Sequence, residues 1–258
     1  MSNENALKFF AEKKLDAPGF ISVETHPGVI HLVDSGTGSK TLVFIHGSPG
    51  SWSAYIEYFS NQELNSVARI IAVDRPGFGQ SEPGKAVPSL QEQARRIKIA
   101  LEKPGDIDKV YLIGHSLGGP VAVRMAIDYP DFVAGLILIA PSMDPELEKM
   151  RWFNTLAYYP PVKWVLPVDW LMSNEEIVPH KQELQQLAGE LGKIVTPVIV
   201  IQGLADDLVP PQNTRYIERQ FSAADPLIVQ CLEGLNHFIP WSRPDLVVDA
   251  ALKLLHDR

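Results

Sequence analysis

The fold is decided by residues 109–127, which read KVYLIGHSLGGPVAVRMAI. The first five are mostly β-branched or apolar and predict a short buried strand, and the residues from Gly118 onward predict a tightly packed helix. Ser116 lies at the junction with a glycine two positions to either side, which is the pattern of a serine nucleophile on a sharp strand-to-helix turn. We expect this turn to strain the backbone of Ser116, and we expect a Cβ at Gly114 or Gly118 to collide with the neighbouring strand and helix. Because so short a pattern also occurs by chance, the flanking strand and helix carry the prediction.

Further buried strands are predicted on both sides of this turn. Two strands come first, within residues 19–33, and are joined by a turn at His26-Pro27. Apolar runs then alternate with predicted helices at residues 41–45, 68–73, 133–140, 197–201 and 227–232. This alternation predicts an α/β fold with a mostly parallel, doubly wound sheet and helices on both faces. We expect residues 1–258 to form a single domain, because no linker or internal repeat divides them.

Residues 144–193 interrupt the alternation. No strand is predicted there, and short helical pieces are interleaved with prolines and aromatic residues. Three of the chain's five tryptophans lie in this segment: Trp152, Trp164 and Trp170. We expect a short helical lid, inserted after the sixth strand, over an apolar site; an ordinary helical crossover is the alternative. Two Ser-x-x-Glu capping boxes, at residues 89–92 and 173–176, predict helix starts.

The composition argues against several classes of protein. A net charge of −8 is opposite to the basic surface that a nucleic-acid-binding protein needs. Cys231 is the single cysteine, so neither an internal disulfide nor a cysteine-based metal cluster is expected, and a reducing cytoplasm fits. No signal peptide or membrane-spanning run is predicted. We expect a small-molecule substrate and neither a metal nor another cofactor; the oligomeric state stays open.

Four polar features fall at the carboxyl ends of predicted parallel strands, where ligands bind in such sheets. They are the loop at residues 46–48, Ser116, the pair Asp206 and Asp207, and His237. The glycine-containing loop at residues 46–48 can aim a backbone N–H at a developing oxyanion. The chain order of serine, aspartate and histidine is that of a hydrolytic triad.

Other polar residues in the predicted loops fit structural roles better. We expect His46 to bond within its own loop, because His237 is the better-placed base. Asp74 and Arg75 could be a catalytic acid and an anion clamp. Their position among turn residues favours an ion pair or hydrogen bonds that hold the loop.

Five motifs, in order, resemble those of the α/β-hydrolase fold superfamily, in the branch of small esterase-like and peroxidase-like enzymes with a lid between the sixth and seventh strands. The motifs are HGSPG (46–50), DRPGFGQS (74–81), GHSLGG (114–119), GLADDLVP (203–210) and HFIPW (237–241). The resemblance extends from about residue 20 to the end of the chain and implies the α/β-hydrolase fold.

The resemblance implies a role for each matching position. Ser116 would attack the substrate carbonyl, and His237 would accept its proton. The motif Gly-x-x-Asp-x-x-Val-Pro aligns on Asp206, which would hold His237, with Asp207 and then Asp144 as alternative acids.

Further positions would complete the site. The resemblance implies an oxyanion hole formed by the backbone N–H groups of Ser48 and Leu117. We expect Trp52, Trp152 and Phe238 to line the substrate pocket.

The implied activity is that of a serine hydrolase that cleaves a carboxylic ester of a small, largely apolar substrate through an acyl-enzyme. The same triad could serve lactone, thioester, amide or carbon–carbon hydrolysis, or perhydrolysis, and a non-catalytic ligand receptor is a remote alternative. Haloalkane dehalogenases and epoxide hydrolases on this fold attack with an aspartate, so Ser116 argues against both. The shortness of residues 144–193 ranks the carbon–carbon hydrolases of aromatic breakdown lower, and Leu117 stands where perhydrolases usually carry methionine.

Overall fold

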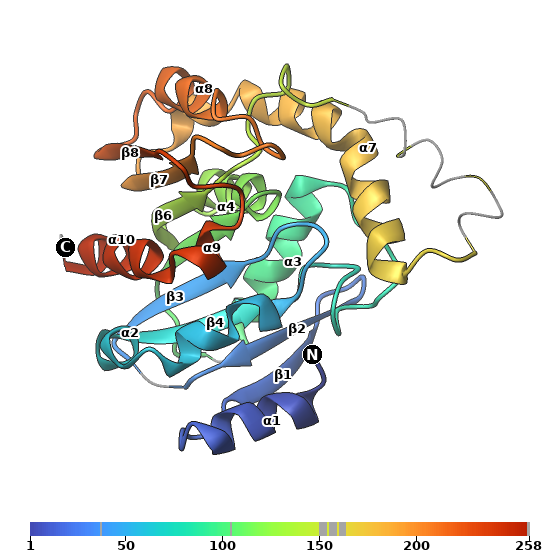
Figure 1. The fold of residues 1–258 in the computed structure, drawn as a ribbon, viewed down its shortest axis with the longest axis vertical. Coiled ribbons are helices and arrows are strands. Elements are labelled where there is room, and N and C mark those ends of the chain that lie inside the picture. The colour runs from blue at the N-terminus through green and yellow to red at the C-terminus, as the bar shows by residue number, and fades with distance from the viewer. Residues whose placement is uncertain (37, 104, 150–153, 155–158, 160–163, 257–258) are drawn as a thin grey trace.

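An eight-stranded sheet runs through the described part of the chain (Figure 1). The computed structural model describes residues 1–36, 38–103, 105–149, 154, 159 and 164–256. In chain order the strands are β1 (Gly19–Glu24), β2 (Val29–Asp34), β3 (Lys40–Ile45), β4 (Ala68–Val73), β5 (Val110–His115), β6 (Val133–Ile139), β7 (Val198–Gly203) and β8 (Leu227–Leu232). Their order across the sheet is β1-β2-β4-β3-β5-β6-β7-β8. The first two strands are antiparallel to their neighbours and all later pairs are parallel, which confirms the predicted α/β class and mostly parallel sheet.

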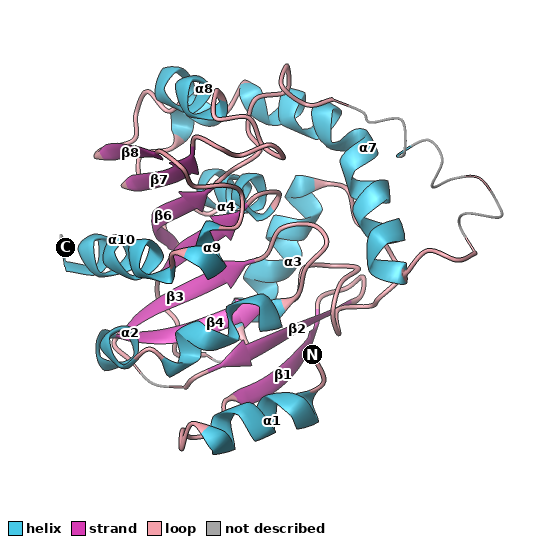
Figure 2. Ribbon diagram, in the orientation of Figure 1, coloured by secondary structure: helices cyan, strands magenta, loops and turns pink. Residues whose placement is uncertain are grey.

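Helices cover both faces of the sheet (Figure 2). One face packs against α1 (Asn3–Glu12), the 3₁₀ helix η1 (Trp52–Ser60), α2 (Gln62–Val67) and α10 (Pro244–His256). The opposite face packs against α3 (Leu90–Glu102), α4 (Gly118–Asp128), the carboxyl-terminal half of α7 (Val168–Ala188) and α8 (Asn213–Gln220). Two short helices, η2 (Leu191–Lys193) and α9 (Ile239–Ser242), complete the described elements. The central strands are apolar along their whole length because both of their faces are covered.

One capping box marks a helix start and the other does not. The Ser89 hydroxyl accepts a hydrogen bond from the Glu92 backbone N–H at 3.3 Å, so α3 begins where it was predicted to begin. The prediction from Ser173 was wrong, because α7 begins at Val168 and Ser173 is buried inside the helix. A serine followed three residues later by glutamate is also compatible with a helix interior, where packing decides its role.

The strand order reverses at β3, which lies between β4 and β5. Helices that follow strands on opposite sides of such a reversal diverge, and the loops at the carboxyl ends of the strands leave a crevice there. The loop after β3 contains residues 46–48 and the turn after β5 contains Ser116. The topology therefore brings two of the four predicted polar features to one place.

Candidate active site

Ser116 occupies a strained turn directly after β5. Its φ angle is +53°, in the left-handed region that residues other than glycine rarely adopt. A Cβ on Gly114 would lie 2.6 Å from the carbonyl oxygen of Gly118, and a Cβ on Gly118 would lie 2.3 Å from the carbonyl oxygen of Ile45 in β3. Both glycines are therefore required by close backbone contacts with the helix and the strand, as expected from the sequence.

His237 and Asp206 are joined by a hydrogen bond. The Nδ1–H of His237 donates to Oδ2 of Asp206 at 2.8 Å, and Oδ1 of Asp206 accepts from the backbone N–H groups of Leu208 at 2.9 Å and Val209 at 2.8 Å. Burial raises the pKa of Asp206, but the hydrogen bond and charge of His237 and the two amides outweigh it and hold that pKa below its ordinary value. Asp206 is thus a buried carboxylate anchored on one oxygen and bound to the histidine through the other.

A second histidine, His115, lies behind His237. The two rings are 4.7 Å apart, and His115 Nε2–H donates to the backbone carbonyl of His237 at 3.0 Å. Burial, and then the charge of His237, lower the pKa of His115 to about 3, so it stays neutral. Trp241 packs edge-on against the His115 ring at 5.2 Å. His115 therefore positions the loop of His237 without adding a positive charge beside it.

Ser48 and Leu117, whose backbone N–H groups are the predicted oxyanion donors, lie beside Ser116. Both residues line a cavity with Ser116, and neither backbone N–H donates to an acceptor among the described residues. The loop that carries Ser48 is held by His46, whose Nδ1–H donates to the Gly47 carbonyl at 2.6 Å and whose Nε2 accepts from the Arg75 amide at 3.0 Å. Burial, and then Arg75, lower the pKa of His46 to about 3. His46 thus has the structural role expected from the sequence.

Two cavities meet at Ser116 and His237. The smaller, of about 190 Å³, has polar and apolar lining in similar measure; we call it the polar cavity because Ser142, Glu148 and Asn154 line it. The larger, of about 350 Å³, is mainly apolar. Its apolar lining comes from Pro49, Ala54, Tyr55, Trp170, Leu208, Phe238 and Trp241. Helix α7 contributes to both cavities, through Ile177 in the polar one and Trp170 in the apolar one.

The three residues predicted to line the pocket have different outcomes. Phe238 lines the apolar cavity, and its contact with a substrate stays a prediction. Trp152 lies outside the described residues. The prediction for Trp52 was wrong, because Trp52 lines neither of the cavities that Ser116 lines. Its side chain is 1% exposed and packs edge-on against Phe20 and Phe59. The reason is that Trp52 begins η1, whose apolar side faces the sheet.

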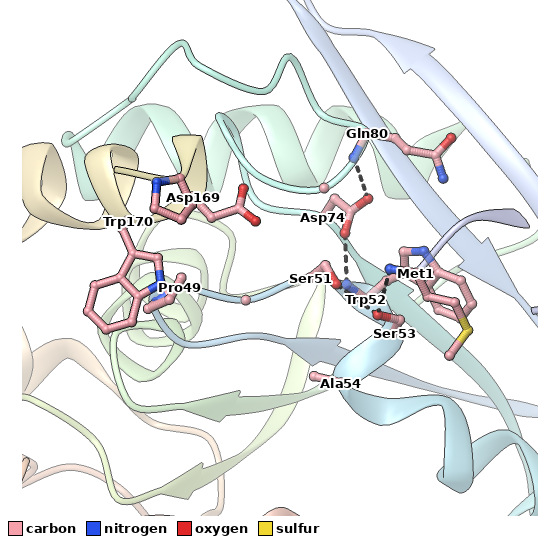
Figure 3. Close-up of a pocket in the computed structure, with 13 residues that line it drawn as sticks. Met1, Pro49, Ser51, Trp52, Ser53, Ala54, Asp74, Gln80, Asp169 and Trp170 are labelled. Carbon is pink, nitrogen blue, oxygen red and sulfur yellow. Dashed lines mark hydrogen bonds between the residues drawn. The ribbon is translucent and has the colours of Figure 1, made fainter. Parts of the chain in front are cut away.

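Trp52 borders a third, more open cavity of about 590 Å³ (Figure 3). That cavity adjoins the apolar one, because the two share Pro49, Gly50, Ala54 and Trp170. Figure 3 shows Asp74 between two backbone donors, the N–H of Trp52 at 2.7 Å and that of Gln80 at 2.8 Å. Asp74 therefore holds its loop with hydrogen bonds, which is the structural alternative favoured from the sequence.

Arg75 forms a buried ion pair with Glu176 of α7. Nη1 of Arg75 lies 2.9 Å from Oε1 of Glu176 and Nη2 lies 3.0 Å from Oε2. Gln93 Nε2 and Ser48 Oγ each donate to the same carboxylate at 3.0 Å, and Arg75 Nη2 donates to the Gly47 carbonyl at 3.0 Å. This cluster ties α7 to the loop that carries the Ser48 amide.

Glu148, Glu176 and Ser142 were not identified from the sequence. Ser142 lies three positions beyond β6, at the same edge of the sheet as Ser116, so the strand topology could have indicated it. Glu176 and Glu148 come from the segment between β6 and β7, where the sequence pattern does not predict which side chains point inward.

The described residues offer no metal centre and no membrane span. No group of three or more histidine, cysteine, aspartate or glutamate side chains among them is arranged to hold an ion. None of the helices in the described ranges combines the length and apolar character needed to cross a bilayer.

Comparison with known proteins gives one family and several relatives. Residues 40–161 match the family model described as alpha/beta hydrolase fold. A 2-hydroxy-6-oxononadienedioate/2-hydroxy-6-oxononatrienedioate hydrolase from Pseudomonas sp is 33% identical over 114 residues, which cover 43% of this chain and 40% of the relative. A protein of the same name from Cupriavidus pinatubonensis is 25% identical over 218 residues, 70% of this chain and 75% of the relative. The first match thus spans less than half of the relative's length.

A likeness in three dimensions extends over nearly the whole chain. The crystal structure of a membrane phospholipase A superposes with a TM-score of 0.71 at 21% identity, covering 97% of this chain and 89% of the other. At this level of identity the likeness concerns the fold.

Proposed function

Because this chain belongs to the α/β-hydrolase fold superfamily, we propose that it is a serine hydrolase with Ser116, His237 and Asp206 as its catalytic triad. One observation carries the proposal: Ser116 and His237 line the same two cavities, and Asp206, which lines neither of them, binds Nδ1 of His237. A nucleophile, a base and a group that orients the base are the three parts that acyl transfer requires.

In this mechanism Ser116 Oγ attacks the carbonyl carbon as His237 Nε2 takes its proton. Asp206 keeps the Nδ1 proton in place and stabilises the imidazolium that forms. The imidazolium then delivers its proton to the leaving group, and a water molecule activated by the same histidine hydrolyses the acyl-enzyme. The buried, neutral His115 supports this cycle, since a second positive charge beside His237 would oppose its protonation.

The oxyanion that forms in each step is stabilised by the amides of Ser48 and Leu117. Neither N–H has an acceptor among the described residues, so both are available to the substrate oxygen. Leu117 is also the N-cap residue of α4, whose amino-terminal end favours negative charge. Loss of one such donor costs roughly 3–4 kcal/mol of transition-state stabilisation.

The bond we propose to be cleaved is a carboxylic ester with an apolar or aromatic part. The apolar cavity, with Tyr55, Trp170, Phe238 and Trp241, suits a ring or short alkyl chain of the substrate. Helix α7 lines both cavities through Trp170 and Ile177, which supports the proposal that it forms part of a helical lid within residues 144–193.

A second candidate is hydrolysis of a carbon–carbon bond, which the names of the relatives favour. The proposed Ser116 machinery also suits that reaction, because both reactions pass through attack on a carbonyl group. The relatives' named substrate is a dioate, with two carboxylates, whereas an ester substrate needs none. A substrate panel of aromatic esters and an oxo-dienedioate, assayed side by side, distinguishes the two candidates.

The test of the triad is labelling with a fluorophosphonate followed by peptide mapping. We expect one labelled residue, Ser116, and a loss of turnover of about 10⁶-fold in Ser116→Ala. Ser142→Ala is the matched control, because Ser142 is a buried serine of the same cavity and its replacement should leave the label on Ser116. A label on another residue, or p-nitrophenyl acetate cleavage by Ser116→Ala at the wild-type rate, would overturn the assignment. Labelling of Ser116 without turnover of any acyl substrate would favour the receptor alternative.

A further inference from the structure

The polar cavity beside Ser116 contains a carboxylate that the triad does not use. Ser142 Oγ–H donates to Oε1 of Glu148, and His180 Nε2–H donates to Ser142 Oγ at 3.2 Å. Ser142 and His180 are 1% and 3% exposed, so this chain of hydrogen bonds is built into the protein interior. No other described residue donates to Glu148, which leaves its Oε2 for a group that enters the cavity.

The charges around this carboxylate do not neutralise it. Burial, and then Arg75, lower the pKa of His180 to about 4, so His180 is neutral near pH 7. Burial raises the pKa of Glu148, the hydrogen bond from Ser142 acts against this, and the nearby negative charge of Asp144 adds to the increase. Lys149 also lines the cavity, but its side chain is exposed and its ammonium group is therefore solvated and screened.

We propose that this cavity binds a substrate group that donates hydrogen bonds or carries positive charge, such as a hydroxyl, amide N–H or ammonium group, and that Glu148 rejects a carboxylate there. The inference rests on the proposed function, since it concerns the substrate of the Ser116 site. A carboxylate placed against Glu148 would meet like charge in a partly desolvated space, whereas a donor would satisfy Oε2.

The two cavities together define a substrate class. Ser116 lies where the polar and apolar cavities meet, so the scissile carbonyl separates an apolar or aromatic part from a part with a donor or cation. This differs from the largely apolar substrate expected from the sequence. It also differs from the dioate in the relatives' names, because one carboxylate of a dioate would have to enter the polar cavity or the apolar one.

Turnover of matched esters tests the proposal. Phenylacetate esters of choline, ethylene glycol, propanol and glycolate present a cation, a hydroxyl, an alkyl group and a carboxylate in otherwise similar molecules. Benzyl esters of trimethylglycine, hydroxyacetate, propanoate and malonate present the same groups on the acyl side. One of the two series places the variable group in the polar cavity. In that series we expect kcat/KM for the cationic and hydroxyl members to exceed that of the carboxylate member by about tenfold or more.

Two glutamate variants separate Glu148 from general surface charge. In Glu148→Gln, kcat/KM for the carboxylate ester should rise by about tenfold. For the choline or trimethylglycine ester, kcat/KM should fall by about tenfold. Glu146→Gln is the matched control, because Glu146 is an exposed glutamate of the same segment that pairs with Lys181 and does not line the cavity. Glu146→Gln should keep the wild-type order of kcat/KM among the esters, because the Glu146 carboxylate that it removes is exposed to solvent.

A measurement of ligand affinity tests the charge preference of the polar cavity independently of turnover. Calorimetry should show 4-phenylbutyl-trimethylammonium binding about tenfold more tightly than 5-phenylpentanoate to the wild type and to Glu146→Gln, with the preference lost in Glu148→Gln. If no ester is hydrolysed but this preference holds, the proposed hydrolase function fails and the inference about the cavity stands. If esters are hydrolysed with no charge preference in either series, or the two ligands bind equally to the wild type, the inference is overturned and the hydrolase function is unaffected.

Discussion

Replacing Glu176 by alanine should destabilise the fold and slow catalysis together. The carboxylate receives two hydrogen bonds from Arg75, one from Gln93 and one from Ser48, at 2.9–3.0 Å. The side chains of Arg75 and Glu176 are 1% and 2% exposed. Without the carboxylate the guanidinium is a buried charge with neutral partners, and breaking a buried pair in this way costs about 3–5 kcal/mol.

The size of this loss depends on how many of the four hydrogen bonds to Glu176 a variant keeps. Glu176→Gln keeps an acceptor for one or two of the four donors, so it should cost less, about 2–3 kcal/mol. The double variant Arg75→Met/Glu176→Leu removes both charges and should be destabilised by clearly less than the sum of the two single changes, because neither partner is left alone.

The catalytic effect follows from the loop that the cluster holds. Glu176 binds the hydroxyl of Ser48 and, through Arg75, the carbonyl of Gly47, and so fixes the loop that carries the proposed oxyanion donor. Loss of a complete donor lowers kcat by about 10²–10³-fold, so a loosened loop should lower kcat by about tenfold to a hundredfold with a smaller change in KM.

The assay is urea unfolding followed by tryptophan fluorescence and far-ultraviolet circular dichroism, with coincident transitions required for the free energies to be compared. Glu175→Ala is the matched control, because Glu175 is the neighbouring glutamate on α7 and makes no ion pair among the described residues. A loss below about 1 kcal/mol in Glu176→Ala, a loss equal to that of Glu175→Ala, or strict additivity in the double variant would show that the buried pair does not stabilise the fold as expected.

Two further predictions concern other carboxylates. Asp206→Asn should lower kcat by about 10⁴-fold, because the amide no longer holds the correct tautomer of His237. Asp207→Asn, at an exposed position, should change kcat little. Initial-rate kinetics on one ester compare the two variants, and equal losses of kcat would contradict the assignment of Asp206. Hydrogen bonds from Lys85 and then Arg96 lower the pKa of Glu82 from 4.5 to about 2, so its contribution to stability is complete above about pH 4.5 and is lost as the pH falls towards 2. The difference in unfolding free energy between wild type and Glu82→Gln should therefore shrink over that range in urea titrations, and a constant difference would exclude the linkage.

Local sequence patterns were sufficient to predict the strands of the sheet and the turn at Ser116. Continuous apolar runs predict strands buried on both faces, and their alternation with helices predicts parallel pairing. The glycines around Ser116 indicate a turn without room for a Cβ, and the structure has a φ of +53° at that serine. These features are local in sequence, because strand burial and backbone strain depend on residues a few positions apart.

Local patterns did not predict the position of a residue where its type fits two places and tertiary packing decides between them. The capping box at Ser173 predicted a helix start, yet Ser173 is buried inside α7. Trp52 was expected in the pocket, but it is the first residue of η1 and packs against Phe20 and Phe59. In both cases the residue type fits either place, and the neighbours that it meets across the fold decide between them.

The partners in the site lie too far apart along the chain for spacing to reveal them. Glu176 meets Ser48 from 128 positions away and Arg75 from 101, and His115 meets the carbonyl of His237 from 122. Local sequence was enough to predict that Ser116 lies on a strained turn at the carboxyl edge of a parallel sheet. The tertiary structure alone decided which buried charges hold its loops and that a carboxylate, Glu148, shares its cavity, because hydrogen bonds and ion pairs depend on distances in space that no local pattern encodes.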